Sequence, residues 1–72
     1  MISERILRQA KLDRPLQIAQ AISIGKSRKE VAAEYKISVR TVEAHLNKLK
    51  FICDAADMAH LIAILFREKL IQ

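Results

Sequence analysis

The chain has 72 residues, a formal net charge of +5 and a single cysteine. A domain of this size buries only roughly 60% of the surface of its unfolded chain, so a large catalytic cavity is not expected. One cysteine excludes an intramolecular disulfide and lacks the companions of a Cys/His zinc site. We therefore expect no enzyme, no metal site and no cofactor, and oligomerisation is the remaining common source of extra stability.

Apolar residues make up 51% of the chain, and a single Gly and a single Pro leave few helix breaks. This composition is typical of a compact helical domain, so the sequence predicts an all-α fold. Charges begin at the fourth residue, and no apolar run suits a signal peptide or a bilayer span. We expect a cytoplasmic protein without a membrane partner.

Two helices are predicted before the only glycine. Ser3 is a candidate N-cap for a short amphipathic helix over residues 3–11, which we expect to pack on the rest of the domain. Asp13 is a candidate cap for a second helix over residues 14–24. Gly25 is the natural residue to end it, because glycine adopts the left-handed conformation without strain.

The next pair of helices has clear boundary signals. Ser27 and Glu30 have the spacing of a capping box, which predicts a helix over residues 28–35. Ile37 is the one apolar residue of a short polar turn, so we expect it to reach the core. Ser38 then caps a helix over residues 39–53.

The helix over 39–53 has an apolar side and a polar side when its residues are placed about 100° apart. The inner side is expected to hold Val42, His45, Leu46, Leu49 and Cys53. The outer side is expected to hold Arg40, Glu43, Ala44 and Asn47. Phe51 also falls on the outer side, and we expect its ring to fold against neighbouring structure.

A last helix is predicted over residues 57–71, with Asp57 as its cap. It has two adjacent apolar stripes, and a domain this small can cover only one of them. The second stripe predicts an interface with another copy, formed by Ala59, Ala63, Phe66 and Leu70. An alternative is that the helix over 3–11 covers this stripe within a monomer.

The two middle helices and their turn make a helix-turn-helix. Between Lys26 and Lys50 there are seven basic and three acidic residues, so most of the net charge lies in this stretch. A helix-turn-helix places its second helix in the major groove of DNA, with its N-terminal residues at the base edges. The sequence therefore predicts double-stranded DNA as a partner and association with the nucleoid.

A pattern of fixed spacing runs through this segment. It reads Gly25-x-Ser27-x-Lys29-Glu30-Val31-Ala32, followed by Ile37-Ser38-x-x-Thr41-Val42-x-x-His45. The pattern resembles the DNA-binding domain of the LuxR/GerE-type transcription regulators, and the resemblance covers roughly residues 12–66. It implies a four-helix domain that binds DNA as a dimer, often through its last helix, and that regulates transcription.

The resemblance also implies roles for individual residues. The base-contacting positions of the family fall on Glu43, Ala44 and Asn47, and Arg40 joins them on the same outer side. The backbone-contacting positions fall on Ser27, Lys29 and Thr41, to which we add His45 and Lys48. Family members often have a lysine at the position of Glu43. A glutamate accepts a hydrogen bond from cytosine N4 but repels phosphates, so this residue either reads a base or weakens DNA binding.

Two functions remain open from the sequence. The first is a stand-alone, homodimeric, sequence-specific DNA-binding regulator of transcription. The second is an adaptor that binds another transcription regulator or RNA polymerase through the apolar last helix. A metal or catalytic role for His45 is disfavoured, because no further ligand-type residue lies three or four positions from it.

Overall fold

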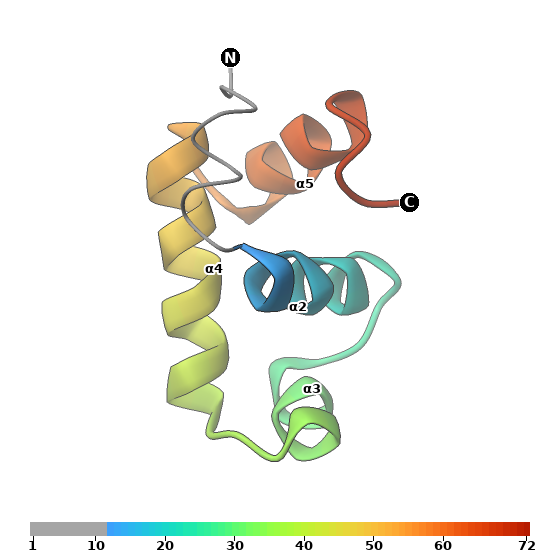
Figure 1. Cartoon of the computed structure of the whole chain (residues 1–72), viewed down its shortest axis with the longest axis vertical. Coiled ribbons are helices and arrows are strands. Elements are labelled where there is room, and N and C mark those ends of the chain that lie inside the picture. Colours follow the sequence, from blue (N-terminus) through green and yellow to red (C-terminus); the bar gives the residue numbers. More distant parts are fainter. Residues whose placement is uncertain (1–11) are drawn as a thin grey trace.

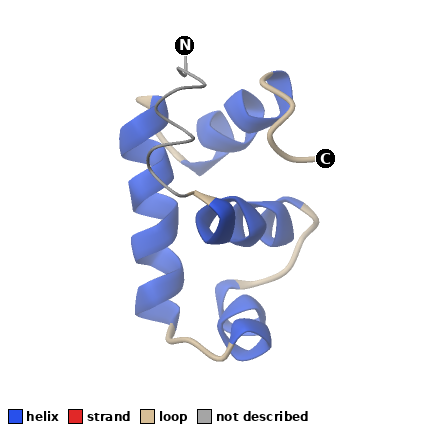
Figure 2. Ribbon diagram, in the orientation of Figure 1, coloured by secondary structure: helices blue, strands red, loops and turns tan. Residues whose placement is uncertain are grey.

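The computed structural model describes residues 12–72, which form four α-helices and no strand (Figure 2). The helices are α2 (Asp13–Ser23), α3 (Arg28–Tyr35), α4 (Val39–Cys53) and α5 (Met58–Arg67). The predicted all-α fold is confirmed, and the helix predicted over residues 3–11 lies outside the described range. None of the four helices has the length and hydropathy to cross a membrane.

The start of α2 differs from the prediction, which placed the helix over residues 14–24. Its N-cap is Leu12, whose side chain accepts no hydrogen bond, so Asp13 is not the cap. Asp13 lies in the first turn instead, where its charge faces the positive end of the helix dipole. The end of α2 follows the prediction, because Gly25 has a φ of 98° and its N–H donates to the carbonyl of Ile22 at 3.0 Å.

The end of α5 also differs, because the helix stops at Arg67 and not at residue 71. Lys69 adopts the left-handed conformation with a φ of 58°, and the N–H of Leu70 donates to the carbonyl of Leu65 at 2.9 Å. This turn directs Ile71 back into the core, where it is buried. The apolar pattern in the sequence extends to residue 71 because Ile71 is a core residue. The pattern alone does not show whether such a residue reaches the core from a helix or from a turn.

The helix α4 organises the fold. It runs along one side of the molecule, and α2, α3 and α5 all pack against it (Figure 1). Its inner side contributes Leu46 and Leu49, which are 2% and 0% exposed. Each such leucine stabilises the fold by about 1.5–3 kcal/mol through burial. The other fully buried large side chains are Ile18, Val31, Val42, Leu61 and Leu65.

Two polar contacts connect α2 to other parts of the chain. The Arg14 guanidinium lies over the ring of Tyr35, 4.9 Å from its centroid, which joins α2 to α3. Such a cation–π contact is worth about 0.5–1 kcal/mol at an exposed site. Farther along α2, the Gln20 amide accepts from the N–H of Gln72 at 2.7 Å and donates to its carbonyl. This pair holds the segment after α5 against α2.

The structure contradicts the prediction that the ring of Phe51 folds against neighbouring structure. Its side chain is 87% exposed. It comes two residues after the buried Leu49, so at about 100° per residue it lies on the opposite side of α4. Cys53, in contrast, is buried as expected, and desolvation raises the pKa of its thiol.

Candidate nucleic-acid interface

The capping box predicted at the start of α3 is present. The Ser27 hydroxyl accepts from the N–H of Glu30 at 3.1 Å, and the Glu30 carboxylate accepts from the N–H of Ser27 at 3.0 Å. The bond from the Ser27 backbone lowers the pKa of Glu30 below its ordinary value of 4.5. The cap therefore stabilises the fold above that value, and the contribution is lost as the pH falls through the lowered pKa. It fixes the start of α3, where Lys29 is exposed.

The turn between α3 and α4 positions the start of the second helix. Lys36 adopts the left-handed conformation with a φ of 57°, and Ile37 is partly buried against the core. The Ser38 hydroxyl then accepts from the N–H of Thr41 at 3.0 Å, and the two hydroxyl oxygens lie 2.9 Å apart. The first turn of α4 is thus held by its own cap, with Thr41 exposed beside it.

The side of α4 that faces away from the core is polar near its start. Arg40, Glu43, Ala44 and Asn47 are all exposed, while Val42, Leu46, Leu49 and Cys53 are buried. The division of α4 into an inner and an outer side therefore agrees with the sequence prediction, except that His45 is only partly buried. The small Ala44 allows close approach of another molecule at the centre of this side.

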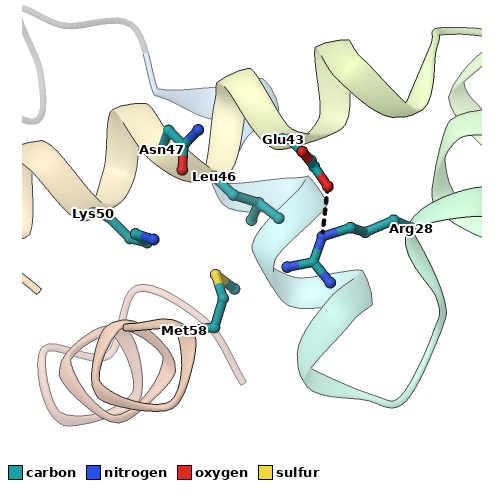
Figure 3. Close-up of a pocket in the computed structure, with 6 residues that line it drawn as sticks. All are labelled: Arg28, Glu43, Leu46, Asn47, Lys50 and Met58. Carbon is teal, nitrogen blue, oxygen red and sulfur yellow. Dashed lines mark ion pairs between the residues drawn. The ribbon is translucent and has the colours of Figure 1, made fainter. Parts of the chain in front are cut away.

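An ion pair joins α3 to the exposed side of α4. The Nε of Arg28 lies 3.5 Å from the Oε1 of Glu43, and both side chains are about half exposed. Figure 3 shows the two side chains pointing toward each other at the rim of a pocket of about 170 Å³. The lining of this pocket consists of Arg28, Glu43, Leu46, Asn47, Lys50 and Met58.

Arg28 is a residue that the sequence reasoning did not assign to the site. It lies in a different helix from Glu43, and no spacing rule within one helix relates the two. The charge pattern could have suggested this ion pair, because Glu43 is the one acidic residue of α4 and several basic residues lie at the start of α3. The ion pair partly offsets the negative charge of Glu43 on the outer side of α4.

Four of the predicted backbone-contacting residues lie in two places. Ser27 and Lys29 lie at the start of α3, and Thr41 and Lys48 lie on α4, all of them exposed. Lys26 differs from this group, because its ammonium pairs with Glu34 at 2.6 Å and that bond raises the pKa of Lys26. The charge of Lys26 is thus partly offset within the fold.

A family of known proteins matches most of the described chain. The family described as bacterial regulatory proteins of the luxR family matches residues 13–59, which include α2, α3, α4 and the start of α5. The chain belongs to the luxR family. No curated protein and no solved structure matches it. The four helices are consistent with a luxR-type helix-turn-helix domain. Membership of this family implies a DNA-binding regulator of transcription.

Within the described residues of this luxR-family domain, one side of α5 is exposed. Ala59, Ala63 and Phe66 are exposed, with Phe66 46% exposed. Leu70 does not extend this stripe as predicted, because it lies beyond the end of α5 and packs partly against the core. The Asp57 side chain caps α5 by accepting from the N–H of His60 at 2.8 Å, as the sequence predicts.

Proposed function

We propose that this luxR-family domain binds double-stranded DNA as a sequence-specific homodimer, with α4 in the major groove. The observation that supports this most directly is the exposed, polar, sterically open side of α4 beside a capped α3. In a helix-turn-helix, the second helix reads base edges while the first crosses the phosphate backbone. Arg40, Glu43, Ala44 and Asn47 are the residues we assign to base edges.

Glu43 is assigned to a cytosine. A carboxylate accepts a hydrogen bond from cytosine N4, but its charge opposes the approach of phosphates. The Arg28 guanidinium beside Oε1 offsets that charge, and a carboxylate has a second oxygen with which to accept. Arg28 is therefore a positioning residue for Glu43 in this proposal.

Selection of bound duplexes from a random pool tests the proposal. A sequence-specific protein enriches a site, and a homodimer enriches two related half-sites one helical turn apart, about 34–36 Å. The selection is done at fixed, stated salt, because counterion release makes every affinity salt-dependent. If no sequence is enriched, specific DNA binding by this domain is ruled out under those conditions.

Replacement of Lys29 by alanine is expected to weaken binding to all duplexes alike. Because the dimer loses one phosphate contact in each half-site, at about 0.9 per contact, the slope of log K against log salt falls by about 1.8. Titration of a selected and a scrambled duplex at several salt concentrations measures both effects. Lys29→Arg is the matched control, since it keeps the charge and the slope. An unchanged slope in Lys29→Ala would remove Lys29 from the backbone contacts.

Replacement of Asn47 by alanine is expected to reduce the preference for particular bases more than the overall affinity for DNA. An asparagine that bonds adenine in bidentate fashion contributes about 1–3 kcal/mol of discrimination. Selection repeated with Asn47→Ala then loses preference at one position of each half-site, while affinity for a scrambled duplex stays within about twofold. If the wild type and Asn47→Ala select the same base at every position to the same degree, the assignment of Asn47 to a base is wrong.

Arg28→Ala and Glu43→Gln are expected to be coupled. Arg28→Ala leaves the charge of Glu43 without its partner, and an exposed pair of this kind is worth about 0.2–1 kcal/mol. The substitution therefore weakens DNA binding severalfold in the wild-type background and less in the Glu43→Gln background. A double-mutant cycle of duplex affinities measures the difference. Strictly additive effects would show that Arg28 contacts DNA independently of Glu43.

The exposed side of α5 is the surface we assign to the dimer. Ala59 and Ala63 allow two helices to approach closely, and Phe66 supplies apolar area to bury. Sedimentation of the protein alone is expected to show a dimer, and Phe66→Asp is expected to give a monomer. Ile24→Asp is the control, because Ile24 is an exposed apolar residue in the turn after α2.

The same α5 surface favours one alternative. An adaptor would use Ala59, Ala63 and Phe66 to bind another transcription regulator or RNA polymerase. Sedimentation separates the two functions, because the adaptor stays monomeric alone at concentrations where the homodimer forms. An adaptor also enriches no DNA sequence in the selection described above.

A further inference from the structure

Phe51 is the most exposed large apolar residue in the part of the chain that the structure describes. Its side chain is 87% exposed, compared with 64% for Ile24, 46% for Phe66 and 37% for Val39. A single exposed apolar residue is common on protein surfaces and by itself indicates nothing. The position of Phe51 on α4 is what distinguishes it.

Phe51 continues the line of residues assigned to the DNA bases. It follows Asn47 by four residues and Ala44 by seven, and residues at these spacings share one side of a helix. Along the helix axis it lies about 6 Å beyond Asn47, at about 1.5 Å per residue. One base step along a DNA strand is about 3.4 Å, so this distance corresponds to about two base steps.

The surroundings of Phe51 favour a nucleic acid over an apolar protein surface. On the same side of α4 its neighbours are the polar side chains Asn47 and Lys48, one turn earlier. The partly buried Lys50 is adjacent in the sequence. A protein interface centred on Phe51 would have to bury these polar and charged groups, whereas the major groove accepts them and also presents one apolar group, the thymine methyl.

We propose that Phe51 contacts the C5-methyl group of a thymine about two base steps from the base that Asn47 reads. The proposal rests on the proposed function, because it requires α4 to lie in the major groove. It adds an apolar specificity contact near the end of α4, beyond the polar contacts at its start. A phenylalanine in contact with this methyl group discriminates thymine from a base that lacks it.

Deoxyuridine tests this contact, since it differs from thymidine only by the absence of that methyl group. Each thymine of the selected duplex is replaced in turn by deoxyuridine, and affinities are measured for the wild type and Phe51→Ala. At one position of each half-site, the wild type is expected to lose about fourfold in affinity. This factor corresponds to the free energy of burying one methylene-sized group. Phe51→Ala is expected to bind the two duplexes equally.

Ile24→Ala is the matched control, because it removes an exposed apolar side chain from the turn after α2, where no role in DNA binding or dimerisation is assigned. It is expected to keep the wild-type ratio between thymine and deoxyuridine duplexes at every position. The proposal is overturned if the wild type is insensitive to every deoxyuridine, or if Phe51→Ala has the same sensitivity as the wild type. It is also overturned if Phe51→Ala changes only the sedimentation of the protein.

The failure of this contact is distinguishable from the failure of the proposed function. A wild-type protein that enriches a site but shows no coupling between Phe51 and any thymine methyl keeps the proposed function and loses the contact. A wild-type protein that enriches no site loses both.

Discussion

Replacement of Leu49 by alanine is expected to lower the free energy of unfolding by about 2–5 kcal/mol. Leu49 is 0% exposed and lies on the inner side of α4, the helix against which the other three pack. Natural domains are stable by only about 0.05–0.15 kcal/mol per residue, so this loss is a large part of the total for a chain of this length. Thermal and urea denaturation followed by circular dichroism measure it.

Phe51→Ala is the matched control for this experiment. It removes a larger apolar side chain from the same helix, but one that is 87% exposed. Surface substitutions of this kind usually change stability by less than about 0.5 kcal/mol. If Phe51→Ala destabilises the protein as much as Leu49→Ala does, the ring is packed against protein, and the assignment of its exposed position is wrong.

Replacement of Ala44 by glutamate is expected to weaken DNA binding on the order of 100-fold, because like charges brought together at an interface cost several kcal/mol. Ala44 is exposed at the centre of the outer side of α4, between the residues assigned to bases. Alanine and glutamate both favour helix, so the fold is expected to remain intact. Affinity for the selected duplex, with circular dichroism as a check of folding, measures the effect.

Two controls separate the causes of this loss. Ala44→Gln adds the same bulk without the charge, and is expected to show the steric part alone. Ile24→Glu makes the same change in net charge at a residue that is 64% exposed, in the turn after α2 that Figure 1 places away from α4. Wild-type affinity in Ala44→Glu, or an equal loss in Ile24→Glu, would show that this side of α4 does not face DNA.

The ion pair between Arg28 and Glu43 changes how Glu43 is interpreted. From the sequence, this glutamate either reads a base or weakens DNA binding. In the structure its carboxylate lies 3.5 Å from a guanidinium on the preceding helix. The pair is exposed and contributes little to stability, so its main effect is on the charge and orientation of the outer side of α4. This is why the coupled substitutions are a sharper test than either one alone.

The sequence by itself determined the features that depend on short-range chemistry. The capping box of Ser27 and Glu30, the cap at Ser38 and the left-handed Gly25 each involve residues within a few positions of one another. The bounds of α3 and α4 follow from these signals. The inner and outer sides of α4 follow from the helical period, which repeats within every turn.

Only the tertiary structure decided the features that depend on residues far apart in the chain. Arg28 reaches Glu43 from another helix, and Gln72 bonds Gln20 across 52 positions. The helical period places Phe51 on the outer side of α4, but only the packed structure shows that no element of the described chain covers its ring. Capping hydrogen bonds and the helical period depend on residues that are close together in the sequence, so the sequence predicts them. The long-range contacts form only when the helices pack together.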